Sequence, residues 1–306
     1  MYDLAIIGGG PAGVSAGVYA SRKQLKTIFI AAEFGGQSIV SEDIQNWIGT
    51  ISIKGLDLAK SLEDHLRAYA KEFVQIQKGE YVKEVTGNKG NFTITTDKGS
   101  YNAKTVLVTT GSTRRQLDIP GAKEFEHKGL TYCASCDGPL FTGQDMIVIG
   151  GGNAAFETAA QLLAYAKSVT LLNRSDTLRA DPVTVEKVLK HPNMTAIKNA
   201  IPTQITGDKF VKSIFYKDAQ THEEKEIIAP AIFVEIGLIP TTSFVKNITP
   251  LNKIGQIIVD PRNQKTQTAG IWAAGDCTDG MYHQNNIASG DAVKALEDIY
   301  VDLHAR

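Results

Sequence analysis

The residues best suited to redox chemistry are the two cysteines of the sequence Cys133-Ala-Ser-Cys136. A CxxC pair can close a disulfide across one helical turn, and a helix N-terminus lowers the pKa of a thiol, which favours exchange with another disulfide near neutral pH. Asp137 follows directly, and its carboxyl group could carry a proton to or from a sulfur, or could cap a helix. These three residues predict a redox-active disulfide with a neighbouring acid.

Zinc binding is the alternative chemistry for a CxxC pair, and it requires two further ligands at a compatible spacing. The sequence has one other cysteine, Cys277, and 6 histidines, but no second CxxC and no closely spaced Cys/His pair. We therefore expect no metal site. Because Cys277 is unpaired in the sequence, we expect it to be a small buried hydrophobic residue without a redox role.

A glycine loop at the start of the chain has the pattern that binds a dinucleotide. It reads Gly8-Gly9-Gly10-Pro11-Ala12-Gly13 and lies between a strand-like run, Tyr2–Ile7, and a small-residue helical pattern. In that context a GxGxxG motif lets a pyrophosphate approach backbone N–H groups at a helix N-terminus. The acidic residue expected at the end of the second strand is replaced by Ala31. Glu33, which follows shortly after, is either its substitute at a ribose hydroxyl or a solvated loop charge.

A second glycine loop repeats the pattern and carries a signal about the type of nucleotide. It reads Gly150-Gly151-Gly152-Asn153-Ala154-Ala155, with alanine as the third small residue, and the strand Val169–Leu172 follows. After that strand there is no Glu or Asp at the position that would bind an NAD ribose. Arg174 and Arg179 lie there instead and could pair with a 2′-phosphate, or could be two exposed surface arginines. The sequence therefore favours NADPH over NADH.

Two copies of one βαβ unit predict an α/β protein with two Rossmann-like dinucleotide-binding domains. A later strand-like segment, Gly270–Asp276, and an amphipathic helix over 285–303 have no room in a second domain of ordinary size. We therefore expect the second domain to be inserted into the first. The predicted boundaries are 1–113 and 248–306 for the first domain, 118–243 for the second domain, and 114–117 and 244–247 for the linkers.

Length and composition support a two-domain globular protein. The chain has 306 residues, 42% hydrophobic and 21% charged, with a net charge of -1. Such a balance gives no overall attraction to nucleic acid or to an anionic membrane, and no apolar run approaches the roughly 20 residues of a membrane span. The chain starts with a strand-like run and has only 3 cysteines, so we expect a cytoplasmic protein rather than a secreted disulfide scaffold.

Two dinucleotide domains with a CxxC just before the second glycine loop resemble the low-molecular-weight thioredoxin reductases along nearly the whole chain. The stretches CDGPLF, AAGDCTD and FVEIGLIP are even more similar to the reductase portion of the F component of alkyl hydroperoxide reductase. That relative carries thioredoxin-like domains ahead of its FAD fingerprint, so we expect any such partner of this chain to be a separate protein. The other similar segments are Gly8–Gly13, Gly35-Gly36-Gln37, Gln45-Asn46-Trp47, Thr109-Thr110-Gly111, Ile119-Pro120-Gly121, Tyr132–Gly138, Gly150–Ala155 and Ala273-Ala274-Gly275-Asp276.

The resemblance implies FAD on the first domain, NADPH on the second domain, and a homodimer. It also implies that Cys136 lies against the flavin, that Cys133 attacks the partner disulfide, and that Asp137 is the acid and base. Two departures stand out. The usual His-Arg-Arg of the phosphate site is Asn173-Arg174-Ser175, and the usual Arg-Gln before the last helix is His283-Gln284.

The loops and the resemblance together give two sets of candidate binding residues. The candidates for FAD are Gly8, Gly10, Pro11, Ala12, Gly13, Glu33, Gly36, Gln37, Asn46, Gly111, Asp276, His283 and Gln284. The candidates for NADPH are Gly150, Gly152, Asn153, Ala154, Ala155, Arg174 and Arg179.

The expected activity is electron transfer from NADPH through FAD and the Cys133/Cys136 disulfide to thioredoxin or a thioredoxin-like protein. One alternative keeps this chemistry with NADH or reduced ferredoxin as the donor, or with a peroxiredoxin-linked carrier as the acceptor. A second alternative is an FAD dithiol oxidase that uses O₂, although an oxidase needs no second glycine loop. A zinc-stabilised nucleotide-binding module is the non-enzymatic alternative.

Overall fold

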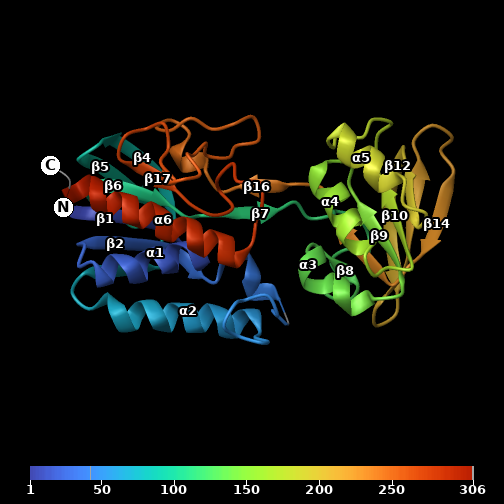
Figure 1. Ribbon diagram of the computed structural model, residues 1–306, viewed down its shortest axis with the longest axis horizontal. Helices are drawn as coiled ribbons and strands as arrows, with labels where there is room; N and C mark the ends of the chain where they lie inside the picture. Colours follow the sequence, from blue (N-terminus) through green and yellow to red (C-terminus); the bar gives the residue numbers. More distant parts are fainter. Residues whose placement is uncertain (42, 305–306) are drawn as a thin grey trace. The chain divides into compact units, whose positions relative to one another are not determined.

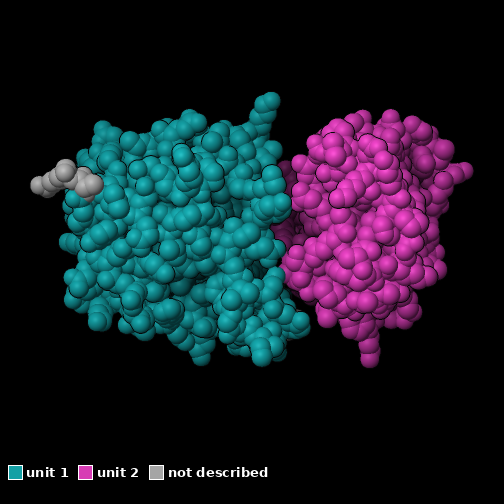
Figure 2. Space-filling model, in the orientation of Figure 1, with its two compact units in different colours: residues 1–113, 239–306 teal, residues 114–238 magenta. Residues whose placement is uncertain are grey.

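The computed structural model describes residues 1–41 and 43–304, and the chain divides into two compact units. Unit 1 consists of Met1–Thr113 and Ile239–Arg306, and unit 2 consists of Arg114–Leu238, as the two colours of Figure 2 show. One unit is therefore built from two separate stretches of chain, and the other unit is continuous.

Unit 1 is organised around a mixed sheet in which the first strand is central (Figure 1). The order is β3-β2-β1-β6-β5-β4, and β17 pairs with β6. β1, β2, β3, β6 and β17 pair in parallel, whereas β4, β5 and β6 pair antiparallel. The strands are β1 (Tyr2–Gly9), β2 (Thr27–Phe34), β3 (Val74–Lys78), β4 (Val82–Asn88), β5 (Asn91–Thr96), β6 (Ser100–Val108) and β17 (Ile271–Ala273).

Both faces of this sheet are buried. Along β1, Leu4 and Ile6 enter one core cluster while Ala5 and Ile7 enter another, because successive side chains of a strand point to opposite faces. The first cluster includes side chains of the three long helices. These helices are α1 (Pro11–Arg22), α2 (Gly55–Ala70) and α6 (Asn285–His304). Among the described residues, no helix is long and apolar enough to cross a membrane.

The C-terminal stretch completes unit 1. α6 packs against α1, and β17 adds a parallel strand beside β6. Trp272 of β17 is fully buried, and its indole N–H donates a hydrogen bond of 2.9 Å to Asp298 Oδ2 of α6. β17 and α6 of the C-terminal stretch therefore belong to unit 1.

Unit 2 has the same plan on a smaller scale. Its parallel sheet has the order β11-β10-β9-β15-β8, and a separate antiparallel sheet has the order β12-β13-β14. The strands are β8 (Leu130–Thr131), β9 (Asp145–Ile149), β10 (Ser168–Leu172), β11 (Met194–Ile197), β12 (Ala200–Gly207), β13 (Val211–Asp218), β14 (Glu224–Ile228) and β15 (Ala231–Val234). The helices are α3 (Ala134–Asp137), η2 (Gly138–Phe141), α4 (Asn153–Leu162) and α5 (Pro182–Leu189).

The chain crosses between the units at places that differ in part from the predicted linkers. The crossings lie in β7 (Ser112–Arg114) and β16 (Leu238–Pro240), which pair as a two-stranded sheet. Residues 244–247 are part of unit 1 instead of a linker, because Phe244 and Val245 are buried in the second core cluster of that unit. The return to unit 1 accordingly begins at Ile239 rather than at residue 248.

A substitution at Val245 tests this placement. Val245→Ala removes two fully buried methyl groups, so we expect the free energy of unfolding to fall by about 2 kcal/mol. The neighbouring exposed Lys246 is the matched control, and Lys246→Ala should change stability by less than about 0.5 kcal/mol. Thermal unfolding followed by circular dichroism measures both. Equal stability of the two variants would show that the segment is a linker after all.

Candidate functional site

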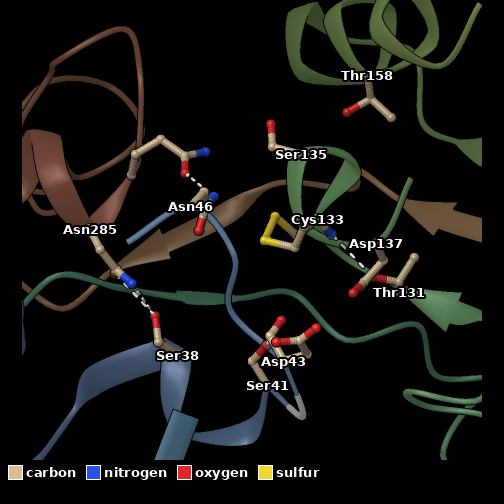
Figure 3. Close-up of a disulfide and its surroundings, with 12 residues drawn as sticks. Ser38, Ser41, Asp43, Asn46, Thr131, Cys133, Ser135, Asp137, Thr158 and Asn285 are labelled. Carbon is tan, nitrogen blue, oxygen red and sulfur yellow. Dashed lines mark hydrogen bonds between the residues drawn. A yellow bond between two sulfur atoms is a disulfide. The ribbon is translucent and has the colours of Figure 1, made fainter. Parts of the chain in front are cut away.

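Cys133 and Cys136 form a disulfide in unit 2 (Figure 3). Cys133 is the residue before α3, Cys136 lies within that short helix, and their Cα atoms are 5.3 Å apart. Both cysteines are partly exposed. The CxxC pair is therefore a formed and accessible disulfide, which is the state in which a disulfide reductase accepts electrons.

Thr131 ties Asp137 to the disulfide turn. Its hydroxyl donates a hydrogen bond to Asp137 Oδ2 and accepts a 3.3 Å hydrogen bond from the backbone N–H of Cys133. The backbone N–H of Asp137 donates to the carbonyl of Cys133 at 3.1 Å. Thr131 thus links the carboxylate of Asp137 to the backbone of Cys133, the first cysteine of the disulfide (Figure 3). The sequence prediction missed Thr131, although a polar residue that ends a buried strand just before a CxxC was a usable signal.

The glycine after Asp137 leaves a space that neighbouring side chains fill. A Cβ atom at Gly138 would lie 2.2 Å from the hydroxyl oxygen of Tyr165 and 2.9 Å from a methyl carbon of Leu162. Burial raises the pKa of the Tyr165 hydroxyl. Tyr165 therefore stays neutral and fills the space beneath the CxxCDG turn.

The first glycine loop has an open surface over a tightly packed base. Gly8 has a φ of 122°, and a Cβ there would lie 2.3 Å from the carbonyl oxygen of Thr109. A Cβ at Gly13 would lie 1.9 Å from the carbonyl oxygen of Gly8, whereas one at Gly10 would meet nothing closer than 4.0 Å. Tight packing at the first and third glycines and open space at the second fit a bound pyrophosphate.

Polar side chains from distant parts of unit 1 gather into two groups near this loop. In one group, Gln37 donates hydrogen bonds of 3.2 Å to Asp276 Oδ2 and to Ser112 Oγ, and His283 Nδ1 lies 3.4 Å from Asp276 Oδ1. In the other group, Asn46 donates a 3.1 Å hydrogen bond to Gln284 Oε1 (Figure 3). The structure thus pairs Gln37 with Asp276 and Asn46 with Gln284, and the members of each pair lie more than 200 residues apart in the sequence. His283 joins the first pair.

The remaining candidates of unit 1 lie in the loop or close to it. The carbonyl oxygen of Glu33 would lie 2.1 Å from a Cβ at Gly9, and the Glu33 side chain is exposed. A Cβ at Gly36 would lie 3.5 Å from the Cα of Gly10. Gly111 has a φ of 63°, and a Cβ there would meet no atom within 4 Å. Pro11 and Ala12 are buried in the first turn of α1. The residues present therefore fit a dinucleotide such as FAD.

The second glycine loop has the same arrangement. Gly150 has a φ of 147°, and Ala155 is fully buried. A Cβ at Gly152 would meet no atom within 4 Å. The side chain of Asn153 accepts a 2.8 Å hydrogen bond from the backbone N–H of Asp181, while Ala154 is exposed. Open space above Gly152 fits a second dinucleotide, and Asn153 contributes by fixing the start of α5.

The segment after β10 closes against this loop without a carboxylate at the strand end. Asn173 is buried, and its amide donates hydrogen bonds to the carbonyls of Ser175 and Thr177 at 2.7 and 3.1 Å. The backbone N–H of Arg179 donates to the carbonyl of Gly151 at 2.7 Å. The Arg174 and Arg179 residues are exposed. Asn173 therefore orders the loop that presents both guanidinium groups.

Cys277 is fully buried, as expected, and its thiol donates to the carbonyls of Ala274 and Val108 at 3.4 and 3.5 Å. Burial raises the pKa of this thiol to about 12. Within residues 1–41 and 43–304, no three His, Cys, Asp or Glu side chains gather in a way that could hold a metal ion.

The glycine positions give a direct test of the first loop. Gly13→Ala forces a Cβ against Gly8 and should lower the stability of unit 1, whereas Gly10→Ala should fold normally and bind flavin more weakly because its methyl group faces the open side. Flavin absorbance of the purified variants, together with thermal unfolding, separates the two effects. Gly99→Ala, where a Cβ meets no atom within 4 Å, is the control. Normal flavin content in Gly10→Ala would show that no ligand approaches this face.

Comparison with known proteins gives consistent results. The family model for pyridine nucleotide-disulphide oxidoreductases matches residues 2–292. Among solved structures, thioredoxin reductase from Streptococcus pyogenes has a TM-score of 0.90 at 32% identity and covers 100% of this chain and 99% of its own. Thioredoxin reductase from Giardia duodenalis has a TM-score of 0.93 at 32% identity, with the same coverage of both chains.

Curated relatives are longer than this chain. An NADH dehydrogenase of Bacillus subtilis is 39% identical over 295 residues, which are 96% of this chain and 57% of that protein. The F component of alkyl hydroperoxide reductase of Pseudomonas putida is 38% identical over 96% of this chain and 56% of its own length. The chain thus spans a little over half the length of the curated relatives it matches.

Proposed function

The chain belongs to the pyridine nucleotide-disulphide oxidoreductase family, and from this premise we propose that it is a thioredoxin reductase-type enzyme. In this proposal electrons pass from NADPH through FAD to the Cys133–Cys136 disulfide, and then to thioredoxin or a thioredoxin-like protein. The observation that carries the proposal is the formed disulfide, with Asp137 linked through Thr131 to the backbone of Cys133, in the unit that also bears the second glycine loop.

The chain's own groups account for cofactor binding. The open backbone at Gly10 receives the pyrophosphate of the first dinucleotide, and the Gln37–Asp276–His283 group offers hydrogen bonds to its polar chain. The open backbone at Gly152 receives the second dinucleotide. When bound, FAD supplies the ability to take a hydride from a nicotinamide and to pass two electrons to a disulfide.

The cysteines pass through one reduction step and two exchange steps. Two electrons and two protons open the Cys133–Cys136 disulfide to a pair of thiols, with Asp137 donating a proton at Cys136. The Cys133 thiol releases its proton to water, and its thiolate attacks one sulfur of the partner disulfide. This forms a mixed disulfide and releases the other partner sulfur as a thiolate, which takes up a proton from water. The Cys136 thiolate, whose proton Asp137 accepts, attacks the Cys133 sulfur. That step frees the partner dithiol and restores the Cys133–Cys136 disulfide.

Single-cysteine variants test these roles. Cys133→Ser should keep the flavin reducible by the nicotinamide but abolish reduction of the partner disulfide, because no thiol remains to attack it. Anaerobic stopped-flow absorbance measures the first property, and turnover with thioredoxin measures the second. Cys277→Ala is the thiol control and should keep turnover, because Cys277 is buried away from solvent. Undiminished turnover in Cys133→Ser would exclude the proposed exchange role.

Thr131 provides a test of the proposed acid. Thr131→Val removes the hydroxyl that holds Asp137, so we expect partner reduction to slow by about tenfold and its pH profile to change, since positioned acids contribute 10²–10⁴-fold. Thr131→Ser keeps the hydroxyl and should restore both. Rates of disulfide exchange between about pH 6 and 9 give the comparison. A valine variant that matches the original rate and profile would remove Thr131 and Asp137 from the exchange step.

The proposal also names NADPH as the electron donor. The exposed Arg174 and Arg179, on a loop without a carboxylate at the end of β10, support NADPH. NADH is the second candidate, because a relative with 39% identity is named an NADH dehydrogenase. Reduced ferredoxin remains the alternative if neither nucleotide reduces the flavin.

Kinetics with both nucleotides decide between the donors. If NADPH is the donor, Arg174→Ala together with Arg179→Ala should raise the KM for NADPH by about tenfold or more and leave the KM for NADH unchanged, because only NADPH carries the 2′-phosphate. The control is Lys190→Ala, which removes a cation from the same unit that is paired with Glu186. Equal effects on both nucleotides would contradict the proposed phosphate contact.

The acceptor class follows from the same reasoning. Relatives named as the F component of alkyl hydroperoxide reductase support a peroxiredoxin-linked carrier with a thioredoxin fold as a second candidate acceptor. Turnover with separately purified thioredoxin-fold proteins distinguishes the two acceptors, and peroxide formation with a dithiol would instead indicate an oxidase. We also propose a homodimer, which light scattering of the flavin-containing protein tests.

A further inference from the structure

Glu235 occupies the edge of unit 2 where a parallel sheet binds ligands. β10 and β11 lie on one side of β9, and β15 and β8 lie on the other side, so the strand order reverses between β9 and β15. Dinucleotides bind outside the carboxyl ends of strands at such a reversal. The second glycine loop directly follows β9, and Glu235 directly follows β15. A Cβ at Gly150 would lie 2.3 Å from the carbonyl oxygen of Glu235, so the two strand ends touch.

The surroundings of the Glu235 side chain favour the neutral form of its carboxyl group. Thr158 of α4 is buried, and its hydroxyl donates a 2.9 Å hydrogen bond to Glu235 Oε1. Burial raises the pKa of the Glu235 carboxyl to about 7, although the Thr158 hydrogen bond and the charge of Arg114 oppose the shift and the charge of Glu157 adds to it. Arg114 of β7 and Glu157 of α4 are the charged groups that act on it. Glu235 is therefore about half protonated near neutral pH.

We propose that Glu235 is a binding residue of the nicotinamide dinucleotide site and that its protonated form is the one that binds. This inference rests on the proposed function only in assuming that the dinucleotide occupies the second glycine loop. A dinucleotide brings the negative charges of its pyrophosphate to the edge where Glu235 lies, and an anionic carboxylate there repels them. A protonated carboxyl removes that repulsion, and its hydroxyl becomes a hydrogen-bond donor while Oε1 keeps the bond from Thr158.

The sign of the pH dependence follows from the raised pKa. Below about pH 7 Glu235 is mostly neutral and binding is at full strength, whereas above that pH the carboxylate predominates and affinity falls. With a pKa of about 7, the apparent Kd rises about tenfold between pH 6 and pH 8, because only the protonated fraction binds. At pH 8 each binding event takes up nearly one proton, roughly 0.9 by the same arithmetic.

Titration calorimetry of the flavin-containing protein tests this directly. The probe is the tetrahydro analogue of NADH, which keeps an uncharged ring, cannot reduce the flavin and lacks a titrating 2′-phosphate. Measurement at several pH values, in buffers with different enthalpies of ionisation, gives both the Kd and the number of protons taken up. We expect the tenfold rise in Kd and nearly one proton taken up at pH 8 for the unmodified chain.

Three variants separate Glu235 from other titrating groups. Glu235→Gln is permanently neutral, so its affinity should match the tight low-pH value at every pH, with no proton uptake. Thr158→Val removes a hydrogen bond that favours the carboxylate, so its loss of affinity should move to higher pH. Glu186→Gln changes an exposed carboxyl on α5 of the same unit and should behave like the unmodified chain.

The outcomes distinguish the inference from the proposed function. Binding without pH dependence in the unmodified chain would overturn the role of Glu235 and leave the nicotinamide site intact. An unchanged pH dependence in Glu235→Gln would assign the titration to another group and would also overturn it. No binding of the analogue at any pH, together with no reduction of the flavin by NADH or NADPH, would instead remove the nicotinamide site from the proposed function.

Discussion

The close approach of each glycine loop to a neighbouring strand is the constraint on which both units depend. Carbonyl oxygens lie where a side chain would begin: that of Thr109 is 2.3 Å from a Cβ on Gly8, and that of Glu235 is 2.3 Å from a Cβ on Gly150. Only a chain without side chains at those points can turn directly from a strand into a helix and leave backbone N–H groups facing outward. The polar residues of both units gather around these two turns.

The disulfide turn of unit 2 depends on a similar restriction. Gly138 leaves room for Tyr165, and the hydroxyl of Thr131 joins Asp137 to the backbone of Cys133. A short helix of four residues gives little stability by itself, so packing and side-chain hydrogen bonds fix the geometry of the CxxC segment. The chemistry of the sulfurs therefore rests on residues outside the motif.

Sequence patterns predicted the local parts of this architecture well. Both glycine loops, the CxxC pair and the two-domain plan follow from motifs in which neighbouring residues act together. Contacts between distant residues escaped prediction, because periodicity carries no information about which strand ends meet. Glu235 was missed for this reason, whereas the partners of Thr131 are the nearby Cys133 and Asp137, so its position just before the CxxC was a usable local signal. The segment 244–247 looked like a linker, but two of its side chains are buried against strands that precede it by more than 100 residues.

The division of unit 1 into two stretches sets an order for folding during synthesis. Residues 114–238 form a continuous unit with its own core, so they can fold as soon as Leu238 has left the ribosome. β1 and α1 are made first, yet β17 and α6 reach them only at the end. Because β7 pairs with β16, the ends of the inserted unit are already close, and the late stretch has little chain entropy left to lose. The Gly8–Gly13 loop is therefore synthesised early and becomes able to hold its ligand last.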